Sequence, residues 1–363
     1  MRFLHTSDLH IGKRLKDQSL LAEQRFFLSQ LLDLVKERDV DAVLIAGDIY
    51  DKSVPSGEAI SMFDDFLTDM NACGTDVFLI AGNHDSAERI DFASRILSRN
   101  RVHISGSDLR MVTLTDAYGE ICIWLMPYMR SVNASAALEA AAVDVRKRNV
   151  ILSHQFVVGE DAVPEKAGSE TLSIGGVDVV SAAAYKAFDY VALGHIHRSQ
   201  TAGSPVIRYS GSPYRYDFGE CNQEKGIWLV EIAAKGSITS EFVPLIPQRD
   251  LYRIECPLAE LAAQIAPRDA YIELTLTDAE PVVDAIYKAR NIYPNTLNLI
   301  PKHRYSSRET THVLTSKDIA MKSPFELFAV FFEDINGAPL SEAQREYLQE
   351  VIAGGAADET ANA

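Results

Sequence analysis

The sequence predicts an α/β protein whose main domain packs two mixed β-sheets face to face, with flanking helices outside. Three observations support this prediction. Short apolar runs alternate with amphipathic segments through residues 1–245. The early runs are separated by helical segments, whereas the later runs are spaced like the strands of hairpins. With 363 residues, 47% of them apolar, the chain can form one large core and smaller appended units.

The predicted strands are the short apolar runs, and the predicted helices are the amphipathic segments. In chain order, the strands cover Arg2–Ser7, Ala42–Ala46, Val77–Ala81, Ile121–Pro127, Val150–Ser153, Tyr190–Leu193, Val206–Ser210, Gly226–Ile232 and Ile238–Val243. The helices cover Leu20–Glu37, Gly57–Ala72, Glu88–Leu97 and Ala134–Arg146. We therefore assign residues 1–245 to one domain.

Two smaller units are predicted after a linker that contains Pro244 and Pro247. Residues 250–308 form a small α+β module, with strands Tyr252–Cys256 and Tyr271–Leu276, helix Pro281–Ala289 and an apolar run at Thr296–Ile300. Residues 323–352 form a helical hairpin, because Ser323 and Ser341 each begin a capping box. The Gly/Ala-rich tail at 353–363 is expected to be disordered.

The first helix of this hairpin is apolar on nearly every side. Its apolar residues are Phe325, Leu327, Phe328, Val330, Phe331 and Phe332. A helix of this kind must be buried, and two short helices cannot cover it between them. We therefore expect a groove on a partner protein to receive it, and packing against the main domain is the alternative.

The net charge of −16 argues against tight nonspecific DNA binding by this chain alone. The negative charge is unevenly distributed, however. Residues 324–363 contain eight acidic residues and one basic residue, whereas residues 285–308 contain five Lys or Arg and no carboxylate. A local phosphate-binding face therefore remains compatible with the composition.

The remaining bulk features predict a cytoplasmic protein. No apolar stretch approaches the ~20 residues of a membrane span, and the N-terminus runs directly into the first motif, which predicts no signal peptide. The cysteines Cys73, Cys122, Cys221 and Cys256 are widely spaced and form no Cys-x-x-Cys pair. They are expected to be free thiols in a reducing compartment.

Five short polar clusters, each directly after an apolar run, are the most informative feature of the chain. They are Asp8-Leu9-His10, Gly47-Asp48, Gly82-Asn83-His84-Asp85, Ser153-His154-Gln155 and Gly194-His195-Ile196-His197. These clusters contain five of the nine histidines. Carboxylates, imidazoles and an amide at strand ends are a ligand set for two divalent metal ions, and such a pair hydrolyses phosphate esters.

Spacing and context separate these clusters from the ordinary alternatives. In Asp8-x-His10 and His195-x-His197, the two side chains are two residues apart and face the same side of an extended backbone. A lone Asp-x-His or Gly-Asp is typical of a turn with a capped helix, and a lone Ser-His-Gln of a hydrogen-bonded histidine. His-x-His alone fits a sheet surface as well as a metal site. Five clusters in order, all at strand ends, favour a metal site. The other histidines, His5, His103, His303 and His312, lack this context and are not expected to be ligands.

The five clusters resemble the motifs of the calcineurin-like metallophosphoesterases. Met1–Asp8, Ala192–Arg198 and Tyr209–Pro213 further resemble the nuclease subunits that act with a coiled-coil ATPase in bacterial DNA repair, recombination and replication. The resemblance implies that Asp8, His10 and His197 hold one metal, that Asn83, His154 and His195 hold the second, and that Asp48 bridges both. It implies manganese as the usual metal, although the sequence does not exclude iron or zinc.

The resemblance also implies a catalytic role for His84, which would contact the scissile phosphate and protonate the leaving oxygen. Asp85 is expected either to orient His84 or to cap the helix that follows. The module at 250–308 would position DNA, with Lys302, His303, Arg304 and Arg308 as candidate phosphate contacts, and an ordinary solvated surface is the alternative.

The resemblance implies two protein contacts. The hairpin at 323–352 would dock on the ATPase, and helix 57–72 with its neighbour would form a homodimer. Helix 57–72 has more apolar residues than one sheet face needs, namely Ile60, Met62, Phe63, Phe66, Leu67 and Met70. A broad stripe facing the core is the alternative.

The leading hypothesis is a metal-dependent DNA nuclease, with double-strand exonuclease and hairpin or single-strand endonuclease activity, that works with an ATPase. One alternative is a related metallophosphoesterase acting on phosphoproteins or small nucleotides. Another is a catalytically inactive scaffold, which five intact motifs argue against.

Overall fold

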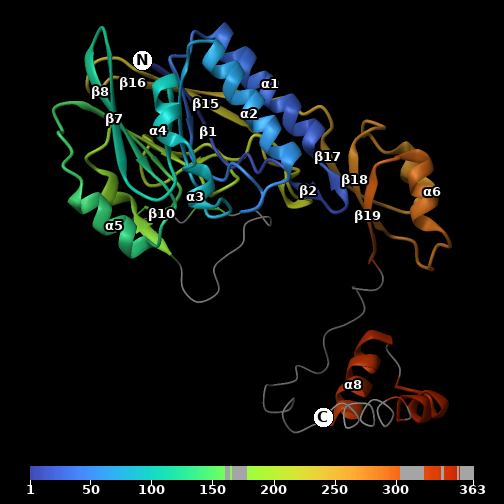
Figure 1. Cartoon of the computed structure of the whole chain (residues 1–363). Helices are drawn as coiled ribbons and strands as arrows, with labels where there is room; N and C mark the ends of the chain where they lie inside the picture. Colours follow the sequence, from blue (N-terminus) through green and yellow to red (C-terminus); the bar gives the residue numbers. More distant parts are fainter. Residues whose placement is uncertain (160–163, 166–177, 303–322, 337–338, 350, 352–363) are drawn as a thin grey trace. The chain divides into compact units, whose positions relative to one another are not determined.

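The computed structural model describes residues 1–159, 164–165, 178–302, 323–336, 339–349 and 351 (Figure 1). Two compact units are present. The first comprises Met1–Ile254, Leu261–Leu274 and Asp284–Leu299, and the second begins with Glu255–Glu260 and Thr275–Val283 and continues from Ile300. The described helices include none that is long and apolar enough to cross a membrane.

Two mixed six-stranded sheets form the centre of the first unit, which confirms the predicted fold class. The first sheet has the order β16-β15-β1-β4-β5-β6 and the second β13-β14-β12-β9-β8-β7. The first consists of β1 (Arg2–Thr6), β4 (Ala42–Ile45), β5 (Asp76–Ile80), β6 (Val102–Ser105), β15 (Gly226–Ile232) and β16 (Ile238–Pro244). The second consists of β7 (Arg110–Asp116), β8 (Gly119–Met126), β9 (Arg148–Ser153), β12 (Tyr190–Leu193), β13 (Gln200–Thr201) and β14 (Ile207–Tyr209).

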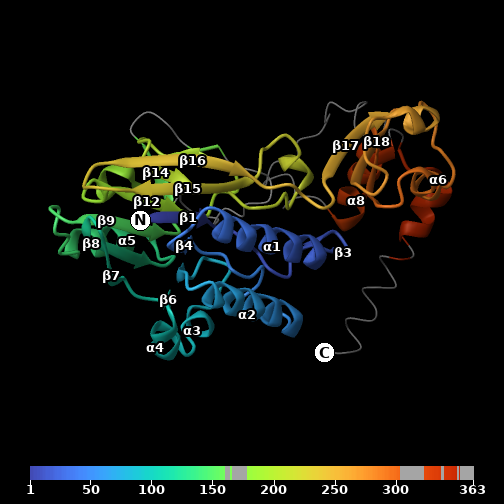
Figure 2. The ribbon, with the colours of Figure 1, turned by 90° about the horizontal axis from the view of Figure 1, so that it is seen from above.

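Side-chain alternation along the central strands divides the core into layers. Phe3 and Leu44 of the first sheet pack with Ile123 and Leu152 of the second, in the layer between the sheets. The opposite face of the first sheet packs against α1 (Leu21–Glu37) and α2 (Gly57–Ala72), which lie next to one another (Figure 2). The outer face of the second sheet packs against α5 (Ser131–Ala140) and its neighbours.

The strand pairing explains why the predicted motifs come together. β1, β4, β5 and β6 are parallel, as are β8, β9, β12 and β14. Carboxyl ends of parallel strands meet at one edge of a sheet. Asp8, Asp48 and Asn83 follow three strands of the first sheet, and His154 and His195 follow two strands of the second.

Two helices predicted within residues 1–245 are wrong in extent. The segment Glu88–Leu97 forms two short helices, α3 (Ala87–Ile90) and α4 (Ser94–Leu97), because Ala93 between them has left-handed backbone with φ 59°. The helix predicted over Ala134–Arg146 is α5, which ends at Ala140. Beyond it, the Asp144 carboxylate accepts a hydrogen bond from the backbone N–H of Arg146, a local turn that competes with helix.

Several short strands escaped prediction. They are β2 (Arg14–Leu15), β3 (Gln18–Ser19), β6, β7, β10 (Phe156–Val158), β11 (Val179–Ser181) and β13. β7 shows why such strands are hard to predict. It lies at the edge of the sheet, and its side chains alternate between half-buried and exposed, so neither face is fully buried. Apolar runs therefore mark central strands better than edge strands.

After residue 250, β17 (Leu251–Cys256), β18 (Tyr271–Leu276) and β19 (Thr296–Pro301) form a three-stranded sheet, with α6 at Ala285–Ile292. Arg249, next to the predicted linker, pairs with Glu23 of α1 at 2.7 Å, and the Tyr271 hydroxyl donates to the same carboxylate at 2.9 Å. The predicted helix Pro281–Ala289 is displaced to Ala285–Ile292, since Asp284 has a positive φ. The domain borders 245, 250 and 308 stay predictions.

Both predicted capping boxes of the C-terminal segment are confirmed. α8 covers Pro324–Asn336, and a second helical segment covers 342–349. The Ser323 backbone N–H donates to Glu326 and the Glu326 N–H donates to Ser323 Oγ, and Ser341 and Gln344 repeat the arrangement. The tail at 353–363 lies outside the described residues.

Candidate metal centre

The carboxyl ends of β1, β4, β5, β9 and β12 bring predicted ligands and His84 into overlapping groups. Three such groups have donor atoms within 4.8 Å of one another. They are Asp8 with His10 and His197, His10 with Asp48 and His84, and Asp8 with Asp48 and His154. Residues separated by up to 189 positions therefore share one small volume, as the metal hypothesis requires.

The backbone around these residues is strained. Asp8, His10, Asp48 and His195 have positive φ angles of 53°, 43°, 51° and 94°. Non-glycine residues adopt such angles at an energetic cost, and strained residues of this kind gather at functional sites. Interlocking loops hold the strain, since the Asp8 N–H donates to Gly47 O at 3.0 Å and the His10 N–H donates to Asp48 O at 2.9 Å.

Both the backbone angle at position 47 and a neighbouring side chain require glycine there. It has φ 90°, and a Cβ at this position would collide with the imidazole of His154. Gly82 has a corresponding role, because a Cβ there would collide with the carboxylate of Asp48. Both glycines allow two strand-end loops to approach one another closely at the site.

The first half of the centre contains Asp8, His10 and His197, all buried. Nε2 of His10 lies 3.1 Å from Nε2 of His197 and 3.5 Å from Asp48 Oδ2. Two ligand atoms at about 2.1 Å from one ion and at right angles to each other lie about 3 Å apart, so this pair fits a shared cation. Nδ1 of His10 is buried and has no hydrogen-bond partner among the described residues.

The second half contains Asn83, His154 and His195. Asn83 Oδ1 lies 3.1 Å from His154 Nε2 and 2.9 Å from His195 Nδ1. Nδ1 of His154 donates to the carbonyl oxygen of Ala46 at 2.7 Å, because a carbonyl can only accept. This bond directs Nε2 toward the centre. His154 is buried, whereas His195 is half-buried and Asn83 is exposed, so this half opens to solvent.

Asp48 lies between the two halves. Its Oδ2 is 3.5 Å from His10 Nε2 and 3.4 Å from His154 Nε2, and its Oδ1 accepts the His84 N–H at 2.9 Å. Burial opposes ionisation of Asp48, but the imidazoles of His154 and His10 outweigh it and hold the pKa of this carboxyl well below its usual range. Burial likewise opposes charge on His154, yet Asp48 raises the pKa of His154 to about 9. The pocket therefore favours positive charge beside Asp48.

His84 lies beside His10 at one side of the centre. Its Nδ1 donates to the Asp51 carbonyl oxygen at 3.0 Å, and its ring meets that of His10 edge-on with centroids 4.8 Å apart. His84 is half-buried, at the rim of the centre.

Asp85 has neither of its two predicted roles. Its carboxylate accepts hydrogen bonds from the backbone N–H groups of Ile49, Tyr50 and Gly82 at 3.0, 3.0 and 2.9 Å, and Ser86 provides the N-cap of α3. Asp85 therefore ties the loop after β4 to the loop after β5. Burial and the nearby Asp48 raise the pKa of Asp85 to about 6.

Sequence reasoning missed the residues that support the ligands from behind. Glu220 contacts His197 Nδ1 at 3.2 Å, and Lys225 pairs with Glu220 at 2.8 Å. Gln24 donates to the His10 carbonyl oxygen at 2.7 Å, and the Tyr216 hydroxyl donates to that of Leu9. These residues lie on α1 and between β14 and β15, and no spacing rule links them to the motifs.

The remaining predictions concern four basic residues at 302–308 and the histidines outside the motifs. Lys302 pairs with Glu255 in the second unit, and His303, Arg304 and Arg308 lie outside the described residues. His5 contacts the Tyr190 hydroxyl at 2.9 Å and His103 contacts Asp76 at 3.2 Å. These two histidines are therefore satisfied outside the centre, as predicted.

Comparison with known proteins gives two family matches. Residues 1–199 match the calcineurin-like phosphoesterases, and residues 247–336 match the type 5 capsule protein repressor C-terminal domain. The chain is also similar to the SbcD component of the nuclease SbcCD from Staphylococcus epidermidis. The two are 28% identical over 373 residues, which cover 97% of this chain and 98% of the relative.

Solved structures include distant neighbours. A dimetal phosphatase from Danio rerio is 13% identical, with a TM-score of 0.43 over 67% of this chain and 95% of its own. An archaeal phosphodiesterase is 13% identical, with a TM-score of 0.31 over 67% of this chain and 100% of its own.

Proposed function

Because the chain belongs to the calcineurin-like phosphoesterases, we propose that it is a DNA nuclease that hydrolyses phosphodiester bonds with two divalent metal ions. The position of Asp48 carries this proposal. Its Oδ2 lies 3.5 Å from an imidazole of one half of the centre and 3.4 Å from an imidazole of the other, where a bridging ligand would be needed. The similarity to a component of the SbcCD nuclease over 97% of the chain supports DNA as the substrate.

Asp8, His10 and His197 would hold one ion, Asn83, His154 and His195 the second, and Asp48 both. Imidazole, carboxylate and amide donors suit manganese, which we propose as the native metal. When bound, the ions would stabilise charge on the phosphoryl oxygens and lower the pKa of the attacking water. The exposed Asn83 and half-buried His195 leave the second half accessible to a substrate phosphate.

His84 would supply the proton for the leaving oxygen. The Asp51 carbonyl accepts its Nδ1–H, so the ring is held by one nitrogen while the other remains for proton transfer. One ring nitrogen of His84 lies within 4.8 Å of donor atoms of both His10 and Asp48. A general acid must reach the departing oxygen directly, and this place at the rim of the centre allows it.

The C-terminal units support a nuclease that works in a complex rather than a stand-alone phosphatase. We propose that residues 323–352 dock on an SbcC-type coiled-coil ATPase. Phe328 and Phe331 of α8 remain 42% and 58% exposed. Exposed large apolar side chains on one helix are typical of a helix that enters a partner's groove. The module at 250–308 would position DNA. We propose that the chain has double-strand exonuclease and hairpin or single-strand endonuclease activity.

The test is manganese-dependent cleavage of a hairpin-ended DNA duplex by the full chain, with and without the ATPase. We expect cleavage with Mn²⁺, none after chelation, and loss of cleavage in Asp48→Asn. Metal analysis should find two ions per wild-type chain and fewer in Asp48→Asn, because both halves lose a charged ligand. A wild-type protein that binds no divalent metal, or that hydrolyses phosphopeptides but no DNA, would reject the proposal.

A further inference from the structure

A buried ion pair lies behind one histidine of the metal centre. Glu220 is 0% exposed and Lys225 is 5% exposed, and Glu220 Oε2 lies 2.8 Å from Lys225 Nζ. Both residues belong to the segment between β14 and β15, which carries none of the five motifs. Burying a pair of charges costs free energy unless further hydrogen bonds satisfy both groups, so the contacts of this pair call for an explanation.

The pair holds His197 at two points. Nδ1 of His197 lies 3.2 Å from Glu220 Oε1, and since the carboxylate only accepts, Nδ1 carries the hydrogen. That tautomer leaves the lone pair of Nε2 directed at the centre, 3.1 Å from Nε2 of His10. Lys225 Nζ donates to the His197 carbonyl oxygen at 2.7 Å and to Ser212 Oγ at 2.8 Å. Both the ring and the backbone of His197 are therefore fixed by one ion pair.

The other half of the centre is supported differently. His154 Nδ1 donates to a neutral carbonyl, that of Ala46, and His195 turns its Nδ1 toward Asn83. An imidazole whose N–H is bound by a carboxylate is a more basic metal ligand than one bound by a carbonyl. The first half is also closed from solvent, whereas Asn83 in the second half is exposed.

We propose that Glu220, with Lys225 as its counter-ion, makes Asp8–His10–His197 the tighter of the two metal sites. Glu220 is a positioning residue that acts through His197. The ion at this site would then bind first and stay through turnover, while the ion at the exposed site exchanges. Lys225 allows the carboxylate to be buried without an excess charge in the metal-free protein. This inference rests on the proposed function, because it requires two metal ions.

The experiment is a Mn²⁺ titration of the metal-stripped full chain. Binding is monitored by calorimetry and by the electron paramagnetic resonance signal of free Mn²⁺. We expect two binding classes in the wild type. In Glu220→Gln, the amide oxygen still accepts from Nδ1 but the charge is gone. The affinity of the tighter binding class should fall about 10- to 100-fold, which is the range for loss of a group that hydrogen-bonds a metal ligand. The affinity of the weaker class should change by no more than about twofold.

Asp116→Asn is the matched control. It makes the same carboxylate-to-amide change beside a buried cation, Arg148, whose guanidinium donates to the two Asp116 oxygens at 2.5 and 3.0 Å. Arg148 begins β9 and His154 follows its other end, so this pair is remote from the centre. Both binding classes should be unchanged in Asp116→Asn. Equal weakening in the two variants would overturn the inference, since the effect would then reflect general loss of a buried ion pair.

The double variant Glu220→Gln/Lys225→Gln separates metal affinity from folding. Glu220→Gln alone leaves Lys225 as a buried cation without its counter-ion, which lowers stability. Thermal unfolding of the metal-free protein should recover in the double variant, while the tighter binding class stays weak. Recovery of affinity together with stability would assign Glu220 a purely structural role. If the wild type binds two ions and Glu220→Gln binds them with the same affinities, this inference is refuted but the proposed function is not. If the wild type binds no ion, the proposed function itself is refuted.

Discussion

His84 belongs to the third motif with Asn83, and we propose different roles for these two neighbouring residues. Nδ1 of His84 binds the Asp51 carbonyl, and the ring meets that of His10 edge-on. The ligand candidates His154 and His197 also direct a nitrogen at the centre, and their Nδ1 atoms contact the Ala46 carbonyl and the Glu220 carboxylate, respectively. Because Nδ1 of both His84 and His154 binds a backbone carbonyl, the assignment of His84 as the acid stays a prediction.

Replacing His84 by Ala should lower the cleavage rate about 100- to 10,000-fold, because the leaving oxygen loses its proton donor. Metal content should remain that of the wild type, since Asp8, Asp48 and the other ligands are untouched. The measurement pairs single-turnover cleavage of a hairpin duplex with metal analysis of the same preparation. His103→Ala, a histidine paired with Asp76 away from the centre, serves as control. Undiminished cleavage by His84→Ala would remove this residue from the mechanism.

At the scale of elements, an ion pair joins two strands of the second sheet, at the ends that are remote from the metal centre. Asp116 at the end of β7 pairs with the buried Arg148 at the start of β9 and with the N-terminal amino group at 2.9 Å. The hydrogen bonds from Arg148 hold the pKa of Asp116 well below its usual range, although burial opposes them. The carboxylate is therefore more easily ionised in the folded than in the unfolded chain.

The sign of this shift predicts acid sensitivity. A depressed pKa in the folded state contributes stability above the unfolded value of about 4, and that stability is lost as pH falls through the folded pKa. The wild type should therefore lose more free energy of unfolding between about pH 5 and pH 2 than Asp116→Asn does. Urea unfolding at several pH values measures the difference. Parallel pH profiles for the two proteins would contradict the prediction.

α8 carries a prediction about association. Replacing Phe331 by Ser should leave the fold of the chain intact, because this side chain is 58% exposed, but should weaken binding to the ATPase at least tenfold, or about 1.4 kcal/mol. Deletion of residues 323–352 should abolish binding. Phe92→Ser, at another exposed phenylalanine, is the control. Co-purification and calorimetry provide the measurement, and unchanged binding after the deletion would assign the hairpin to this chain's own core.

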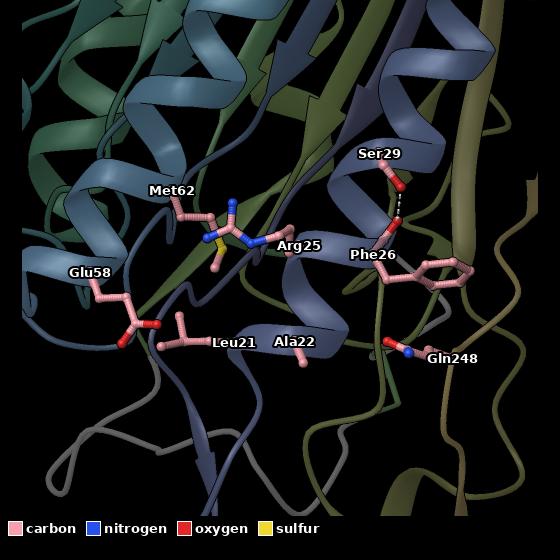
Figure 3. Close-up of a pocket in the computed structure, with 8 residues that line it drawn as sticks. All are labelled: Leu21, Ala22, Arg25, Phe26, Ser29, Glu58, Met62 and Gln248. Atoms are coloured by element: carbon pink, nitrogen blue, oxygen red, sulfur yellow. Dashed lines mark hydrogen bonds between the residues drawn. The ribbon is translucent and has the colours of Figure 1, made fainter.

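At the scale of the molecule, most of the apolar excess of α2 is buried inside its own unit. Met62, Phe63, Phe66 and Met70 belong to the core against the first sheet, and Ile60 remains 47% exposed. A hollow of about 610 Å³ lies over α1 and α2, lined by Phe26, Met62 and Gln248 among others (Figure 3). A core-facing stripe thus explains most of the pattern, and the homodimer predicted from the sequence would depend on Ile60 and this hollow.

The homodimer is testable by one substitution. Ile60→Glu should shift a wild-type dimer to monomer, because a carboxylate replaces an apolar contact at the proposed interface. Val132→Glu on α5, also at an exposed position, should leave the oligomeric state unchanged. Sedimentation over a range of concentrations distinguishes the outcomes. A wild type that sediments as a monomer throughout would reject the dimer.

Sequence alone predicted the fold class, the central strands of both sheets and the order of the motifs, and it proposed a donor set for the centre. These features follow from local pattern, since apolar runs form buried strands and ligands sit where strands end. The edge strand β7 and the break at Ala93 were missed, because neither leaves a strong periodic signal.

Only the tertiary structure decided which groups stand behind the ligands. Glu220 and Lys225 contact His197, and Asp85 contacts the loop after β4, so each of the three acts on a residue at least 23 positions away. A carboxylate in a loop has no distinguishing local pattern whether it faces water or a buried imidazole. Its role arises from the low-dielectric surroundings that the folded chain builds around it.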